Sequence, residues 1–304
     1  MASNSTLRFN DPSREFGIAG AGRVARSLGK LLNDRGQRVV AVASRKPSRA
    51  RNAAAFIGSG VQDLTYVELA SKVESILIAV SDDSIADVAT TLALDLRKGT
   101  VLHTSGIHGT DVLAPLTEQG NSGAGLHPLQ TIATPEQGLE KLPGSTFSIA
   151  GSGRAAGWAE QIVNLLEGEI LSIDSDQKPT YHAAAVMASN YVVSLIDAAV
   201  QVMGAAGVEP EAARRALAPL IGASVENALG QPAEALTGPI RRGDLQTLEL
   251  HLQGLASLPP SIDQLYRSLG MHTVQVALEQ GLESADAGQV EHLLRKAETG
   301  GQNQ

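Results

Sequence analysis

Short apolar runs alternate with amphipathic segments over the first half of the chain. Four such runs, rich in β-branched and other apolar residues, lie at residues 16–20, 38–43, 75–80 and 100–104. Strands that alternate with helices favour a parallel sheet joined by right-handed crossovers. Three further strands are predicted at residues 123–126, 146–150 and 169–173. We therefore predict a mostly parallel sheet of seven or eight strands in an α/β domain.

The pattern changes at the polar segment 174–179, DSDQKP. Beyond it the apolar positions keep helical spacing, and no run has the composition of a strand. Helices are predicted at residues 180–206, 209–230, 244–257, 261–280 and 285–297. We place the two domains at residues 14–177 and 178–298, so that an all-α domain follows the α/β domain.

Length and charge narrow the class of protein. A chain of 304 residues is long enough to build two separate cores. The formal net charge of -8 argues against a nucleic-acid surface, which needs clustered basic residues. Because cysteine is absent, the chain has no disulfide, no thiolate nucleophile and no Cys-ligated metal. We predict no metal site.

Export and membrane insertion are not supported by the sequence. Residues 1–12 are polar and lack the basic start and apolar stretch of a signal peptide. The most apolar segment, residues 191–208, contains Ser194, Asp197 and Gln201, which a membrane span would have to bury unpaired. We expect a core or interface helix there, and a cytoplasmic protein that does not contact a membrane.

The strongest local signal is the segment 17–25, GIAGAGRVA, which follows a predicted strand and precedes a predicted helix. It contains G-x-G-x-x-A, the phosphate-binding fingerprint of the dinucleotide-binding Rossmann fold. Gly20 permits the tight turn, Gly22 lets the backbone approach a pyrophosphate, and Ala25 allows close helix packing. The residues predicted to contact the cofactor here are Gly20, Ala21, Gly22, Arg23 and Val24.

The end of the second strand indicates which dinucleotide binds. An NAD site would carry an acidic residue there for the ribose 2′-hydroxyl, whereas this chain has Ser44, Arg45 and Lys46. These side chains can hydrogen-bond and neutralise a 2′-phosphate. The segment therefore favours NADP(H) over NAD(H), although a solvated basic loop is an alternative.

The turn after the strand at residues 75–80 should pass close to the ribose or nicotinamide, because ligands of open α/β sheets lie beyond the carboxyl ends of strands. We expect Val80 and Ser81 to contact the cofactor. Asp82, Asp83 or Ser84 could equally be the N-cap of the next helix.

Two more strand ends carry residues suited to proton transfer. His127, and to a lesser degree His103, could give or take the proton that accompanies hydride transfer, because the pKa of histidine lies near neutral pH. Either imidazole could instead be held by backbone carbonyls. Ser105 could hydrogen-bond a substrate carbonyl or cap its own turn.

The helix predicted at residues 180–206 has one polar arc on an otherwise apolar surface. This arc holds His182, Ser189, Asn190 and Asp197. Small alanines around it would let another surface approach closely. The arc favours a helix that lines an interdomain cleft, although the arc could instead be the solvent-exposed face of a surface helix.

A loop between two later helices carries candidate anion-binding residues. Thr237, Arg241 or Arg242 could hold an anionic substrate group, while Asp244 is expected to cap the next helix. We expect His251 to be structural.

With these motifs, nearly the whole chain resembles an uncharacterised bacterial family that pairs a Rossmann-like domain with a helical C-terminal domain of unknown function. The matching segments are residues 20–24, 103–106, 126–130, 181–186, 188–191 and 236–240. That family is similar to ketopantoate reductase, pyrroline-5-carboxylate reductase, the β-hydroxyacid dehydrogenases and prephenate dehydrogenase. The resemblance implies NADP(H)-dependent hydride transfer and a homodimer built through the helical domain.

The resemblance also bears on the catalytic residues. His127 and Pro128 match the His-Pro pair that carries the catalytic histidine of prephenate dehydrogenase. Ketopantoate reductase and the β-hydroxyacid dehydrogenases use a lysine and an asparagine on the first interdomain helix. Asn190 matches that asparagine, but His182 stands where the lysine is expected. Lys178 is nearby, and we expect the hinge beside Pro179 to hold it outside the helix.

Together these features predict an NADP(H)-dependent oxidoreductase that transfers hydride to or from a C=O or C=N carbon of a small, carboxylate-bearing molecule. His127 is the expected acid or base, with His182 as the second candidate. Ser105, Ser189 and Asn190 are expected to orient the substrate. The alternatives are a non-catalytic NADP(H) sensor and an enzyme that exchanges hydride with a deazaflavin.

Overall fold

The computed structural model describes residues 15–232 and 234–296, which divide into two compact units. The first unit extends to Ser189 and the second begins at Asn190. Helix α8 (Lys178–Met187), which we had assigned to the second domain, belongs to the first unit. The predicted outer domain ends, residue 14 and residues 297–298, lie outside the described residues, as does the N-terminal segment 1–12.

The first unit contains one eight-stranded sheet with the order β3-β2-β1-β4-β5-β6-β7-β8. Its strands are β1 (Glu15–Ala19), β2 (Arg38–Ala43), β3 (Gln62–Leu64), β4 (Ser75–Ile78), β5 (Thr100–His103), β6 (Ser122–Pro128), β7 (Thr146–Gly151) and β8 (Glu169–Ser172). Neighbouring strands are parallel except β6 and β7. The predicted mostly parallel sheet is therefore confirmed. The sequence analysis missed β3, whose three residues are polar or only half-buried.

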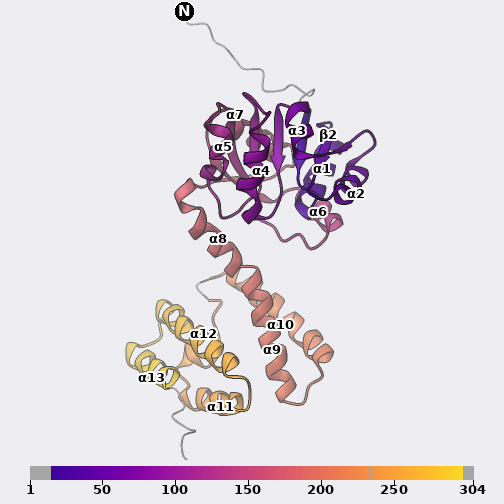
Figure 1. Cartoon of the computed structure of the whole chain (residues 1–304). Coiled ribbons are helices and arrows are strands. Elements are labelled where there is room, and N and C mark those ends of the chain that lie inside the picture. The colour runs from indigo at the N-terminus through magenta and orange to yellow at the C-terminus, as the bar shows by residue number, and fades with distance from the viewer. Residues whose placement is uncertain (1–14, 233, 297–304) are drawn as a thin grey trace, which may run out of the picture. The chain divides into compact units, whose positions relative to one another are not determined.

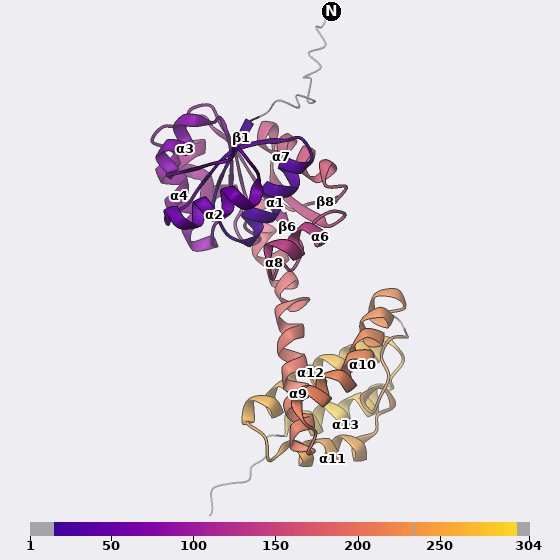
Figure 2. The ribbon, with the colours of Figure 1, turned by 90° about the vertical axis from the view of Figure 1, so that its right-hand side faces the viewer.

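Helices cover both faces of this sheet (Figures 1 and 2). One face carries α1 (Arg23–Asp34), α2 (Pro47–Ile57), α6 (Pro135–Lys141) and α7 (Gly153–Leu165). The other face carries α3 (Tyr66–Lys72), α4 (Ile85–Leu92) and α5 (Ala114–Thr117). Short 3₁₀ segments occur at η1 (Asp82–Ser84), η2 (Thr110–Leu113) and η3 (Ser175–Gln177).

The central strands are buried on both faces, which explains their continuous apolar runs. Ile76, Leu77 and Ile78 of β4 are fully buried. On one face Phe16 meets Trp158 of α7 edge to face, with ring centroids 5.6 Å apart. Burying each such ring stabilises the fold by roughly 2–3 kcal/mol.

Every described element of the second unit is a helix. These helices are α9 (Asn190–Ala205), α10 (Pro210–Gly230), η4 (Ile240–Arg242), α11 (Leu245–Leu255), α12 (Pro260–Glu279) and α13 (Ser284–Arg295). The helix predicted over residues 180–206 is interrupted by a turn at residues 188 and 189, which separates α8 from α9. Leu248, Val274 and Val290 form a buried core between α11, α12 and α13. An all-α C-terminal region is thus confirmed.

The apolar character of α8 and α9 is largely unburied. In the described part of the chain, one helical stretch, Ser175–Ala205, is long and apolar enough to cross a membrane by length and composition, and only 11% of its most apolar window is buried. Exposed apolar side chains continue from α9 onto α10, at Tyr191, Val193, Leu220, Val225 and Leu229. An exposed apolar surface of this kind is typical of an interaction face.

Candidate functional site

The turn after β1 has the geometry that the glycine pattern predicts. Gly20 has a φ of +140°, and a Cβ added there would lie 2.1 Å from the carbonyl oxygen of Ala79. Its backbone N–H donates to the carbonyl of Ala43 over 2.8 Å. Only glycine therefore fits between β1 and β4, and it holds the start of α1 at the carboxyl edge of the sheet.

Gly22 is the N-cap residue of α1 and faces open space. A Cβ at Gly22 would meet no atom within 4 Å, and no described side chain caps the helix. The first backbone N–H groups of α1 are thus accessible to an anion, which the helix dipole also favours. The fully buried Ala25 lets α1 pack closely on the sheet. This cradle fits a dinucleotide pyrophosphate.

The other predicted residues of this turn lie around the same helix start. Ala21 and Val24 pack against the buried core, and Arg23 is exposed. The guanidinium of Arg23 donates to the carbonyl of Ala133 over 3.1 Å, which connects the turn with the loop before α6.

The basic segment after β2 is open to solvent beside this turn. Ser44 is half-buried, and Arg45 and Lys46 are exposed. Burial raises the pKa of Tyr66, and the charge and backbone of Arg45 oppose that rise, so this phenol lies against the segment. A hydroxyl and two cations at the carboxyl end of the second strand fit the 2′-phosphate of NADP(H).

The turn after β4 agrees with the capping alternative in position, because Ser84 is the N-cap residue of α4. Ser84 occupies the N-cap position of α4 without a side-chain bond to the helix, and its hydroxyl lies 3.0 Å from that of Ser81. Val80 packs against the core. Asp82 is half-buried, and its charge acts on Lys178 and on the imidazoles of the site.

His103 is fully buried and held by backbone groups on both sides. Its Nδ1 accepts the Ser105 N–H over 3.2 Å, so Nε2 carries the proton and donates to the carbonyl of Gly109 over 2.9 Å. Burial is the main reason that its pKa falls to about 4. Backbone groups therefore hold both ring nitrogens of His103, which is the alternative to a role in proton transfer.

Ser105 occupies the turn after His103. Its Oγ accepts the backbone N–H groups of Ile107 and His108, over 3.2 and 3.1 Å. These bonds are the turn-capping role that the sequence analysis gave as the alternative to substrate binding.

His127 lies at the centre of the site. Its Nδ1 is 2.9 Å from the hydroxyl of Tyr181, and the ring of His182 stands edge to face at 6.1 Å. A Cβ added to Gly106 would lie 2.9 Å from His127 Nε2 and 2.6 Å from His182 Nδ1. Gly106 thus leaves room for two imidazoles that converge on the turn after β5.

The electrostatic environment keeps His127 neutral at neutral pH. Burial lowers the pKa of His127 to about 4, with further lowering by the positive charge of Lys178 and by His182. The carboxylate of Asp82 acts in the opposite direction.

Lys178 contradicts its predicted placement. We expected the hinge to hold it outside the helix, but it is the first residue of α8 and is fully buried. Its Nζ donates to Ser148 Oγ over 2.9 Å and lies 5.0 Å from the ring centre of Tyr181. Burial lowers the pKa of Lys178 to about 8, and Asp82 opposes this effect. Pro179 starts the helix rather than excluding its neighbour, since proline is favoured in a first turn.

The remaining predicted residues of this helix lie in different places. His182 is half-buried, and its Nδ1 is a buried atom without a hydrogen-bond partner in the described structure. Ser189 Oγ donates to the carbonyl of Ala185 over 2.7 Å. Asn190 begins α9 in the second unit. The structure therefore brings His182 to His127, while Ser189 bonds the backbone of its own helix.

The loop before α11 has mainly structural contacts. Asp244 caps α11 by accepting the Thr247 N–H over 3.1 Å, as predicted. The guanidinium of Arg241 donates to the carbonyl of Gln280, and Arg242 lies 3.8 Å from Asp244. His251 Nδ1 is 2.8 Å from the Tyr266 hydroxyl.

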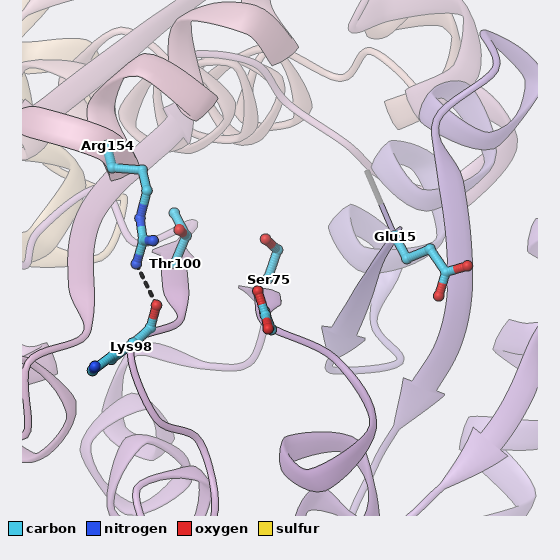
Figure 3. Close-up of a pocket in the computed structure, with 6 residues that line it drawn as sticks. Glu15, Ser75, Lys98, Thr100 and Arg154 are labelled. Atoms are coloured by element: carbon cyan, nitrogen blue, oxygen red, sulfur yellow. Dashed lines mark hydrogen bonds between the residues drawn. The ribbon is translucent and has the colours of Figure 1, made fainter. Parts of the chain in front are cut away.

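A polar pocket of the first unit, with a volume of about 270 Å³, lies at the amino edge of the sheet (Figure 3). It is lined by Glu15, Glu74, Ser75, Lys98, Thr100 and Arg154. The guanidinium of Arg154 donates to the Lys98 carbonyl over 2.5 Å. Since ligands of open α/β sheets bind at the carboxyl edge, this pocket is not the dinucleotide site.

Sequence reasoning missed several residues of the His127 cluster. Tyr181 and Ser148 were not singled out, and Gly106 was seen only as part of a motif. The Lys178-Pro179 pair was an available signal for a helix start. The tyrosine directly before His182 carries no signal without the fold.

Models of two domain families match the chain. A Rossmann-like domain matches residues 2–128, and a domain of unknown function, DUF2520, matches residues 145–273. No match was found among curated proteins.

Solved structures share the fold along most of the chain. A protein from Thermotoga maritima is 25% identical with a TM-score of 0.70, covering 87% of this chain and 99% of its own. A candidate NADP oxidoreductase from Bacteroides fragilis is 23% identical with a TM-score of 0.68, covering 85% and 96%. A pyrroline carboxylate reductase from Plasmodium falciparum, with NADP bound, is 15% identical with a TM-score of 0.57, covering 92% and 98%.

Imine reductases share this fold as well. The resemblance that the sequence motifs indicated is thereby confirmed. The first part of the chain thus matches a Rossmann-like domain and the second part matches DUF2520, and the fold is the one found in those solved structures.

Proposed function

We propose that the protein is an NADP(H)-dependent oxidoreductase that acts on a C=O or C=N carbon of a small, carboxylate-bearing molecule. The observation that carries the proposal is the His127 imidazole, which faces Gly106 on the same sheet edge as the open glycine turn. A proton-transfer group and a dinucleotide cradle at one sheet edge are what a nicotinamide-dependent reduction requires.

The cofactor would be held by residues already described. The turn of Gly20 and Gly22 would take the pyrophosphate, and Ser44, Arg45 and Lys46 the 2′-phosphate. When bound, the nicotinamide would supply or accept the hydride.

The chain's own residues would supply the proton. His127 presents Nε2 toward the Gly106 turn, at the carboxyl edge of the sheet where the substrate would bind. The unpaired Nδ1 of His182 offers a second hydrogen-bonding atom at the same place. Since a buried polar atom without a partner is costly, a polar group of the substrate would stabilise it.

Cofactor choice is tested by titrating NADPH and NADH against Arg45→Asp. We expect the substitution to weaken NADPH at least tenfold and NADH far less, because it places a carboxylate where the 2′-phosphate would bind. Arg38→Asp, which makes the same charge change at the amino end of β2, is the control and should leave both affinities unchanged. Equal losses of both coenzymes at Arg45 would contradict NADP(H) selection.

The acid–base assignment is tested with a panel of 2-oxo acids and cyclic imines. For any compound that oxidises NADPH, we expect His127→Ala to reduce the rate roughly 10²- to 10⁴-fold. His251→Ala, whose imidazole bonds Tyr266 in the second unit, is the control. An unchanged rate for His127→Ala would refute the role of His127, and tight NADPH binding without any turnover would favour a sensor.

We also propose that two copies associate through the helical unit. The support is the exposed apolar surface of α9 and α10, which would be costly to leave in water.

A further inference from the structure

A chain of hydrogen-bonding side chains extends from His127 away from the open turn. Its members are Lys178, Ser148, Tyr181 and His127. Lys178 Nζ is 2.9 Å from Ser148 Oγ, and the Tyr181 hydroxyl is 2.9 Å from His127 Nδ1. Ser148 is close enough to the Tyr181 hydroxyl to lower the pKa of that phenol, which partly offsets the rise caused by burial. The four groups therefore follow one another from Lys178 to His127.

Each group in this hydrogen-bonded series donates to the next one, in the direction from Lys178 to His127. The Lys178 ammonium has only donors, so Ser148 Oγ accepts from it and must donate its own hydrogen onward to Tyr181. The hydroxyl of Tyr181 then donates to His127 Nδ1. A neutral imidazole that accepts at Nδ1 carries its proton on Nε2, the nitrogen that faces Gly106.

The hydrogen-bonded series ends, on the side away from His127, at the buried ammonium of Lys178. Lys178 and Ser148 are fully buried, and lysine is almost never fully buried without a partner. The groups that face Lys178 are the hydroxyl of Ser148, the ring of Tyr181 and the charge of Asp82. His103 and His127 are close enough for the ammonium to lower their pKa values. This environment favours release of the Lys178 proton.

We propose that Lys178 is the source of the proton that the substrate receives, and that Ser148, Tyr181 and His127 conduct it to the substrate in one relay. The proposal rests on the function proposed above and names the residues that complete its proton transfer.

The step balances as a concerted shift of four protons. His127 gives its Nε2 proton to the oxygen or nitrogen of the carbonyl or imine, whose carbon would receive hydride from the nicotinamide when that cofactor is bound. His127 Nδ1 takes the Tyr181 proton, Tyr181 takes the Ser148 proton, and Ser148 takes one from Lys178. The ammonium of Lys178 becomes a neutral amine, and His127 stays neutral throughout.

The relay removes a difficulty of using His127 alone. With a pKa of about 4, an imidazolium at His127 is scarce at neutral pH, so direct donation from it would be slow. Lys178, with a pKa of about 8, is mostly protonated at pH 7 and close to the working range. Passing the proton through neutral His127 joins an available donor to an accessible nitrogen.

Imidazole ¹⁵N NMR of the whole protein tests the relay without a substrate. At pH 7 we expect His127 to be neutral with its proton on Nε2. The ¹⁵N chemical shift of its Nδ1 should then change slightly near pH 8, in a second step beyond the titration of the ring itself, as Lys178 loses its proton. Ser148→Ala should abolish that second shift, and Ser148→Thr, which keeps the hydroxyl, should retain it. A proton on Nδ1, or a shift near pH 8 that is equally large in Ser148→Ala, would overturn the proposal.

Single-turnover reduction of pyruvate and 1-pyrroline with bound NADPH tests the relay in action. We expect Ser148→Ala and Tyr181→Phe to slow proton-coupled reduction about 100-fold, and the wild-type rate to fall above about pH 8. Lys178→Arg keeps the charge but cannot release its proton, so it should be as slow as Lys178→Met. A purely structural role for Lys178 predicts instead that Arg restores the rate.

The two proposals fail in different ways. A wild-type protein that binds no NADPH contradicts the proposed function, whereas the tautomer of His127 still reports on the relay. NADPH oxidation that requires His127 but is unaffected by Ser148→Ala overturns the relay alone. Thermal unfolding of each variant shows whether a loss arises from misfolding.

Discussion

Two histidines with lowered pKa values, His103 and His127, make the stability of the first unit depend on pH. Burial holds the pKa of His103 at about 4, below the value of 6.5 for an exposed histidine. A depressed histidine pKa means that the unfolded chain binds protons more readily than the folded one. The stability is then complete above pH 6.5 and is lost as the pH falls from 6.5 toward 4. The difference in pKa corresponds to roughly 3 kcal/mol for a group as buried as His103.

Chemical denaturation between pH 7.5 and 4.5 checks this expectation. The free energy of unfolding should fall with the pH, and His103→Gln should flatten the fall because an amide does not titrate in this range. The substitution should also lower stability at pH 7.5 by about 1–3 kcal/mol, since one of the two backbone bonds of His103 is lost. A slope as steep in His103→Gln as in the wild type would show that this imidazole is not the cause.

Gly106 is expected to be essential because of what surrounds it. An added Cβ would lie within 3 Å of both His127 Nε2 and His182 Nδ1, so Gly106→Ala must displace the two imidazoles. We expect the rate of NADPH oxidation to drop at least tenfold with a smaller effect on NADPH affinity. Gly288→Ala, in a helix with open space around that position, is the control and should leave the rate unchanged. Wild-type activity in Gly106→Ala would remove the case for catalysis at this turn.

The limits of sequence reasoning are clearest among these same residues. His127 could be identified because it ends a predicted strand next to a recognisable turn. Its partners could not, because Tyr181 is 54 residues away and Ser148 lies 30 residues from the lysine that it bonds. Hydrogen bonds of that range depend on strand order and on where a helix begins, which local patterns do not determine.

At the scale of elements, the arrangement of β7 and α8 creates the site. β7 is antiparallel to β6, so that Ser148 stands opposite His127 in the register of the two strands. The start of α8 then brings Lys178 and Tyr181 to that pair. The sequence predicted both elements, yet not their pairing, and the two-residue error at the start of α8 was enough to misplace Lys178.

The turn between β1 and α1 is expected to tolerate no side chain at Gly20. A Cβ there would collide with the Ala79 backbone, at a φ that other residues rarely adopt. We expect Gly20→Ala to lower the free energy of unfolding by at least about 2 kcal/mol and to abolish NADPH binding, as measured by denaturation and titration.

Gly36→Ala separates the collision from backbone strain. Gly36 has a φ of +85° but open space around it, so its substitution should cost only about 1 kcal/mol and leave NADPH binding intact. If Gly20→Ala were no worse than Gly36→Ala, the close approach of the turn to β4 would not matter for the cofactor site.

At the scale of the whole molecule, the pattern of apolar positions predicted an α/β region followed by an all-α region, but not the residue at which the first compact unit ends. The composition of residues 174–179 predicted a hinge, whereas the first compact unit extends to Ser189. Lys178, Tyr181 and His182 of α8 contact side chains of the sheet in that unit. Tertiary contacts of this kind are not visible in local composition.

The same apolar positions predict self-association of the helical unit. Tyr191 and Val193 on α9 are 61% and 69% exposed, and Leu229 on α10 is 82% exposed. Burying such side chains against a second copy would stabilise a dimer by roughly 1.5–3 kcal/mol for each large group. We expect analytical ultracentrifugation to give about twice the chain mass of 31.6 kDa.

Charge introduced into this surface should separate the two copies. The double variant Val193→Glu with Leu229→Glu would bury two unpaired carboxylates in a dimer, so we expect it to sediment as a monomer that remains folded. Leu94→Glu, at a 63% exposed leucine of the first unit, is the matched control and should stay dimeric. Because the stretch Ser175–Ala205 is also apolar enough for a membrane, lipid vesicles provide the competing partner. Insertion into lipid is disfavoured because the polar side chains of Asp197 and Gln201, paired over 2.7 Å, would have to enter the membrane. A wild-type protein that is monomeric and binds to vesicles would contradict the proposed dimer.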